Sequence, residues 1–141
     1  MIKKSKRAQS IVELIAGIIV LIPIVFIVID LSIIVMASFK NESICREACR
    51  AAASSDPKDC LTPAKAEVDK YNQPGGFATF ALNGNPQTTN VELPSSGHGQ
   101  VSGTVSLKTT ATVHAPFIVG FFVPTCKLDS EQSFPITYNM P

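Results

Sequence analysis

The feature that most constrains this sequence is an apolar run close to its beginning. Residues 14–29 carry no charge and are almost all Ile, Val, Leu or Phe, and with its flanks the run covers residues 11–37. As a helix, residues 11–37 would reach about 40 Å, enough to cross a bilayer core of about 30 Å. Lipid favours a helix, because an unpaired backbone polar group is costly there. The run therefore predicts a transmembrane helix that tolerates Pro23.

The charges around the run predict its direction. Four basic residues precede it, and cytoplasmic segments are enriched in Lys and Arg; they are Lys3, Lys4, Lys6 and Arg7. We therefore expect a single-pass inner-membrane protein with a cytoplasmic basic leader (1–10), a transmembrane helix (11–37), a continuing stem helix (38–56) and an extracytoplasmic head (57–141). The whole chain has 12 Lys+Arg against 11 Asp+Glu. This balance argues against a nucleic-acid surface, which needs clustered cations.

A cleaved secretory signal is the competing interpretation of the same run. Its basic start fits, and Val35-Met36-Ala37 offers small residues for a signal peptidase. The apolar segment is longer than the usual core of about 7–15 residues, which favours a retained anchor.

The start of the run resembles the signal of type IV prepilins. A basic patch and a small residue, Ala8, precede Gln9, and Glu13 follows inside the apolar helix. The resemblance implies that a prepilin peptidase cuts between Ala8 and Gln9, although Ala8 stands where these enzymes prefer Gly. Glu13 would become the fifth mature residue. It would pair with the new N-terminal amine of a neighbouring subunit and so set the register of packed helices.

More specifically, about the first 53 residues resemble the TadE family of minor pseudopilins, from tight-adherence (Flp-type) pilus systems. Four landmarks occur in the family's order, and they are Gln9 with Val12 and Glu13, then Pro23, then Ile29-Asp30, then Arg46-Glu47-Ala48-Cys49-Arg50-Ala51-Ala52-Ala53. The resemblance implies a structural subunit that acts by helix packing with other pilin-like subunits and the pilus assembly machinery. It implies no catalytic residue and no cofactor.

Two acids interrupt the run, and a carboxylate in lipid is costly unless it has a partner. Glu13 either has a partner or lies solvated at the headgroup level. Asp30 lies deeper, and we expect it to be a helix–helix contact group; a protonated or snorkelling acid near the outer interface is the alternative. The two acids differ by about 260° around an α-helix, so one partner helix cannot easily satisfy both.

The rest of the chain predicts an α+β head of the pilin type. Residues 39–53 favour helix, and Ile44, Ala48, Ala51 and Ala52 form an apolar stripe. A short helix opens at Thr62-Pro63, with Thr62 as its cap. Segments 77–82 and 88–93 flank Asn83-Gly84-Asn85-Pro86 and predict a hairpin.

The best strand signal covers residues 101–114. Val101, Gly103, Val105, Leu107, Thr109, Ala111 and Val113 alternate with mostly Ser, Thr and Lys. This alternation predicts one buried and one wet face. Segment 117–123 is apolar, and a buried connector under the sheet is favoured over membrane contact. Residues 134–138 predict a closing strand, and the sheet should lie against the stem helix.

All four cysteines follow the membrane segment, in a space that permits disulfides. We favour Cys49 with Cys60 and Cys45 with Cys126, because Cys45 and Cys49 lie one helical turn apart and would bridge each other only under strain. A zinc site is the rival, but the chain has no CxxC pair.

No pattern of residues indicates catalysis, and we expect no enzyme, metal or cofactor. The leading hypothesis is a TadE-like minor pseudopilin. The alternative is an unprocessed, membrane-anchored extracytoplasmic binding module that is unrelated to filaments.

Overall fold

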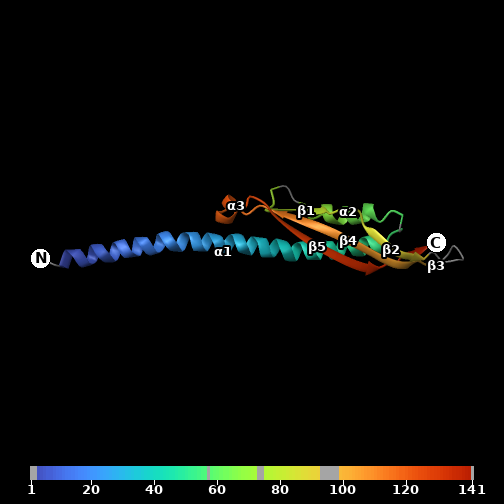
Figure 1. Cartoon of the computed structure of the whole chain (residues 1–141), viewed down its shortest axis with the longest axis horizontal. Helices are drawn as coiled ribbons and strands as arrows, with labels where there is room; N and C mark the ends of the chain where they lie inside the picture. The colour runs from blue at the N-terminus through green and yellow to red at the C-terminus, as the bar shows by residue number, and fades with distance from the viewer. Residues whose placement is uncertain (1–2, 57, 73–74, 93–98, 141) are drawn as a thin grey trace.

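The computed structural model describes residues 3–56, 58–72, 75–92 and 99–140. A long helix, α1 (Lys3–Ala53), runs through the molecule, and a small head covers only its second half (Figure 1). The head contains α2 (Leu61–Asp69), β1 (Ala78–Leu82), β2 (Gln87–Glu92), β3 (Gly99–Gln100), β4 (Ser102–Val113), α3 (Ile118–Phe122), β5 (Cys126–Pro135) and β6 (Asn139–Met140). The predicted α+β class, a long N-terminal helix with a small antiparallel sheet, is confirmed.

The predicted membrane and stem segments form one continuous helix. α1 has 51 residues and continues through Pro23, so it is about 77 Å long at helical rise. It ends at Ala53, three residues before the predicted end of the stem. The carbonyl oxygen of Ala53 accepts a hydrogen bond from the backbone N–H of Thr137 at 2.8 Å. This contact satisfies one of the carbonyls that a helix end leaves without an intrahelical partner.

The central strand of the sheet is β4. β5 pairs with it in antiparallel register from Thr104↔Pro135 to Val113↔Cys126. On the other edge of β4, β1 pairs with residues 109–113 and β2 with residues 102–106, while β3 and β6 form a separate pair. The predicted alternation of β4 is confirmed, because Val101, Val105, Leu107, Thr109, Ala111 and Val113 are buried.

The predicted hairpin between β1 and β2 is wrong. Both strands run antiparallel to β4, so they lie one after the other along a single edge and do not pair with each other. The backbone N–H of Asn83 donates to the carbonyl oxygen of Lys108 at 2.9 Å, which keeps the chain on β4 beyond the end of β1. The Asn-Gly-Asn-Pro segment therefore interrupts an edge strand and does not reverse the chain.

Two further local predictions need correction. The predicted closing strand at 134–138 is instead the end of β5 followed by an irregular segment, and β5 begins eight residues earlier, at Cys126. Thr62 is not the cap of α2, because the N-cap is Cys60 and the Thr62 hydroxyl donates to Asp59 Oδ1 at 2.6 Å.

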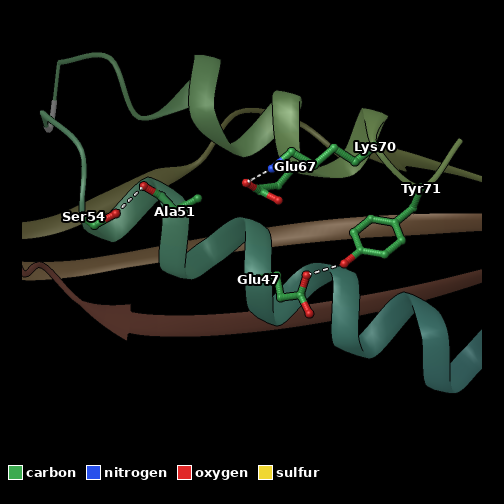
Figure 2. A network of polar contacts seen from close by, with 6 residues as sticks. All are labelled: Glu47, Ala51, Ser54, Glu67, Lys70 and Tyr71. Carbon is green, nitrogen blue, oxygen red and sulfur yellow. Dashed lines mark hydrogen bonds and ion pairs between the residues drawn. The ribbon is translucent and has the colours of Figure 1, made fainter.

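α2 packs against α1 on the side shown in Figure 2. The Tyr71 hydroxyl, just after α2, donates to the Glu47 carboxylate on α1. This hydrogen bond raises the pKa of Tyr71. The predicted apolar stripe of the stem is largely confirmed, since Ile44, Ala48 and Ala52 are buried in the core of the head.

Candidate functional site

The first half of α1 leaves its apolar side chains uncovered. From Ile11 to Ile29 nearly every side chain is exposed, and only Phe26 is half-buried. Among the described residues, α1 is the one helix that is long and apolar enough to cross a membrane. A core helix of a soluble domain would be covered by the rest of its own chain. The exposed half of α1, residues 11–29, therefore needs a bilayer or other helices around it.

Glu13 lies on this exposed half, close to its beginning. Its side chain is exposed, and it has no ion-pair partner among the side chains that the structure describes. Gly17 follows one turn later, and an added Cβ there would meet no atom beyond the adjoining backbone of its own helix. Glu13 and Gly17 thus share a face on which a neighbouring backbone could approach closely.

Asp30 has a very different environment, because it is fully buried. Its Oδ1 accepts a hydrogen bond from the backbone N–H of Phe117 at 3.2 Å, and its Oδ2 accepts one from Val119 at 2.8 Å. The sequence predicted a partner on another helix for this acid. The structure supplies that partner within the same chain, at the start of α3. A contact of Asp30 with a second subunit stays a prediction.

α3 lies beside α1 at the end of the head that is nearer the N-terminus (Figure 1). The rings of Phe26 and Phe117 stack with centroids 4.8 Å apart and an angle of 18° between their planes. On the outside of α3, the side chains of Phe121 and Phe122 are 86% and 77% exposed. The preferred interpretation of this segment as a connector buried under the sheet is therefore wrong.

The second half of α1 is held to the sheet by a seam of side chains spaced four residues apart. The buried Asn41 donates from Nδ2 to the carbonyl oxygens of Leu128 at 2.9 Å and Thr109 at 3.3 Å, and its Oδ1 accepts from the Thr109 hydroxyl at 3.0 Å. Cys45 and Cys49 follow on the same line and lie over the next carbonyls of β4 and β5. Four helical residues advance about 6 Å and two strand residues about 6.6 Å, so helix and sheet stay matched along this seam.

The predicted disulfides do not form in this structure, where Cys45, Cys49, Cys60 and Cys126 are all free. Cys45 Sγ lies 3.4 Å from the carbonyl oxygen of Ser130, whereas Cys126 is four residues earlier on β5. Four strand residues span about 13 Å, which is too far for a disulfide. Cys49 faces β4 and β5 rather than Cys60 at the start of α2. The two seam cysteines pack as small hydrophobic residues.

We expect Cys45 and Cys49 to resist alkylation in the folded protein. Burial, together with the neighbouring Cys45, raises the pKa of Cys49 to about 11, so its thiol stays protonated at neutral pH and is a poor nucleophile. Mass spectrometry after iodoacetamide treatment should find Cys126, which is half-buried, modified well before either seam cysteine. Unfolding should make all four reactive. Disulfide-linked peptides from the untreated protein would contradict the free seam thiols.

Several of these residues were missed by the sequence analysis. No packing role was assigned to Asn41 or Phe26 from the sequence, and α3 was not predicted as a helix. The spacing of Asn41, Cys45 and Cys49 was available as a signal, because small residues four apart mark a face for close packing. Among the described residues, no group of three or more His, Cys, Asp or Glu side chains could hold a metal ion.

Comparison of the chain with protein-family models, with curated proteins and with solved structures found no match.

Proposed function

We propose that this protein is a TadE-like minor pseudopilin, a membrane-anchored structural component of a pilus or related secretion filament. One observation carries the proposal most strongly. A single helix supports a folded head with its second half and leaves its first half, residues 11–29, apolar and exposed. A subunit that assembles by helix packing needs one part of its helix to hold the head and another part to contact neighbouring helices.

Membrane insertion comes first in the proposed mechanism. The basic leader stays in the cytoplasm, α1 crosses the inner membrane and the head is exported. The contacts of Phe26 and Asp30 with α3 support a retained helix. A signal peptidase cut after Ala37 would remove both residues and leave α3 without its support.

Specific pairing in the membrane must then come from features other than the hydrophobic effect. Lipid tails are as apolar as Ile or Leu, so burial of apolar side chains gives little net gain there, and close packing and polar contacts decide which helices associate. Glu13 is the acid available for such a contact, because Asp30 is already occupied within its own chain.

Processing would supply the partner of Glu13. A prepilin peptidase that cuts between Ala8 and Gln9 leaves a free amine four residues before Glu13. Four residues correspond to about 6 Å along a helix. A neighbouring subunit displaced axially by about that distance could place its amine beside Glu13, and this ion pair would set the register of the packed helices. The exposed surface of the head would then select partners among the other pilin-like subunits and the assembly machinery.

N-terminal sequencing after co-expression with a cognate prepilin peptidase tests this proposal. We expect the mature chain to begin at Gln9. A matched variant, Ala8→Gly, carries the residue these enzymes prefer and should be processed at least as completely. A chain that keeps Met1 in both forms would contradict the proposal and favour the alternative, an unprocessed anchored binding module outside any filament.

A further inference from the structure

We propose that α3 and its flanks, residues 115–125, insert into the bilayer beside α1, among the acyl chains of the leaflet on the head side. This inference rests on one part of the proposed function, that α1 crosses the bilayer. It does not depend on filament assembly.

The position of α3 along α1 places it at the depth of the membrane boundary. α3 contacts α1 at Phe26 and Asp30. A bilayer core of about 30 Å accommodates about 20 helical residues. If the core begins just after Glu13, it ends near Ile33, and Asp30 lies about 5 Å inside it.

The surface of α3 is suited to lipid and poorly suited to water. The chain carries no charge from Ala115 to Cys126, and Lys127 is the first charged residue after α3. The side chains of Phe121 and Phe122 are largely exposed. Because Phe26 and Phe117 stack, the apolar segment that contains α3 lies directly against the exposed half of α1. Any bilayer that surrounds α1 at this level must therefore also meet α3.

Asp30 lowers the cost of placing the start of such a short helix in lipid. The first amides of a helix have no intrahelical partner, and an unpaired amide is strongly unfavourable in a bilayer. The carboxylate of Asp30 accepts the amides of Phe117 and Val119, and the carboxylate is itself completely enclosed. Two amide donors at the start of α3 are thus paired with the carboxylate of Asp30 inside the contact between α1 and α3, and the exposed side chains of Phe121 and Phe122 are apolar.

Tryptophan fluorescence provides a direct test, because the sequence contains no Trp. The full-length variant Phe121→Trp is reconstituted into phosphatidylcholine vesicles with or without bromine on the acyl chains. Leu21→Trp, on the exposed half of α1, is the positive control, and Val91→Trp, on β2, is the control for the head. We expect brominated lipid to quench Phe121→Trp and Leu21→Trp about twofold or more, and to leave Val91→Trp unchanged.

The role of Asp30 is tested in the same system. In the Phe121→Trp background, Asp30→Ala should lower quenching to the level of Val91→Trp, and Asp30→Asn, which keeps one acceptor oxygen, should give an intermediate value. Equal quenching of Phe121→Trp with Asp30, Asp30→Ala and Asp30→Asn would show that insertion of α3 does not depend on Asp30.

Two further outcomes would contradict the insertion of α3, and a third would contradict the insertion of the whole protein. Quenching of Leu21→Trp alone would mean that α1 spans the bilayer while α3 stays outside it. Blue-shifted but unquenched emission from Phe121→Trp that depends on protein concentration would identify a second copy of the chain as the occupant. Failure of both positions to quench would contradict membrane insertion itself, and with it the proposed function.

Discussion

Replacing Glu13 by Gln is expected to reduce incorporation of the protein into filaments strongly while leaving its amount in the membrane unchanged. The two side chains have nearly the same size, so the substitution removes the charge and preserves the packing. In the proposed assembly, Glu13 pairs with the N-terminal amine of a neighbouring subunit in an environment of low dielectric. Hydrogen bonds to charged groups contribute about 1.5–3 kcal/mol, so the loss at each subunit contact should reduce assembly about tenfold or more.

The matched control for this prediction is Glu42→Gln. Glu42 is an acid on the same helix, and its pair with Arg46 lies on the surface of the head. Exposed pairs of this kind contribute little, about 0–1 kcal/mol. Filament yield and membrane-fraction immunoblots, measured in the cell that produces the cognate assembly system, should therefore separate the two variants. Equal filament yield from Glu13→Gln and the unmodified protein would remove the register role of Glu13.

The second large effect concerns Asn41, which we expect to be the most damaging single position in the head. Asn41→Leu deletes two donors and one acceptor at a site with no access to water. It leaves the hydroxyl of Thr109 and the carbonyl oxygen of Leu128 without their partner in α1. Each buried unsatisfied group costs about 1–3 kcal/mol, so a total loss of about 2–4 kcal/mol is expected. The melting temperature of the full-length protein in detergent, followed by circular dichroism, should fall by about 10 °C or more.

Two further variants identify the cause of that loss. Ser43→Ala changes an exposed residue on the opposite side of α1 and should leave the melting temperature unchanged. Thr109→Val should be destabilising by itself, and combined with Asn41→Leu it should cost less than the sum of the two single changes, because both remove the same hydrogen bond. Strict additivity would show that Asn41 and Thr109 act independently.

The elements with strong local signals were predictable from the sequence. The apolar run and the helix formers after it predicted α1, and the alternation from Val101 to Val113 predicted β4 with its buried face. β5 was largely missed because Ser130 and Gln132 occupy positions on its inner side, where an apolar pattern would have revealed the strand. Their contacts with the cysteines of the seam are made by backbone carbonyl oxygens, which leave no signature in the sequence.

The path of the chain between β1 and β2 and the partner of Asp30 depend on contacts between residues far apart in the sequence. Local sequence patterns do not reveal such contacts. Asn83-Gly84-Asn85-Pro86 has the composition of a turn, yet β4 is long enough to pair with the strands on both sides of it. The partner of Asp30 lies 87 and 89 residues away and consists of backbone amides, which have no side-chain signature. The sequence could indicate that this acid needs a partner, and only the fold could identify it.

The cysteine pairing could not be predicted for the same reason, because it depends on contacts between residues far apart in the sequence. The predicted exported location made disulfides a reasonable prediction, but pairing requires a particular Cα separation. The fold instead uses Cys45 and Cys49 for close contact between α1 and the sheet. Asn41 belongs to the same seam, so its hydrogen bonds and the packing of two thiols together hold the head to the helix.

Site-specific photo-crosslinking tests most directly the central claim that the exposed half of α1 packs against other pilin-like helices. A benzophenone amino acid replaces Val20, which is exposed on α1, and Thr88, exposed on β2, serves as the control position on the head. After irradiation of cells that produce the assembly system, we expect Val20 to form a covalent product with another pilin-like subunit, and we expect Glu13→Gln to abolish that product. If Val20 crosslinks to lipid alone, with or without Glu13, the helix has no protein partner and the assembly role is contradicted.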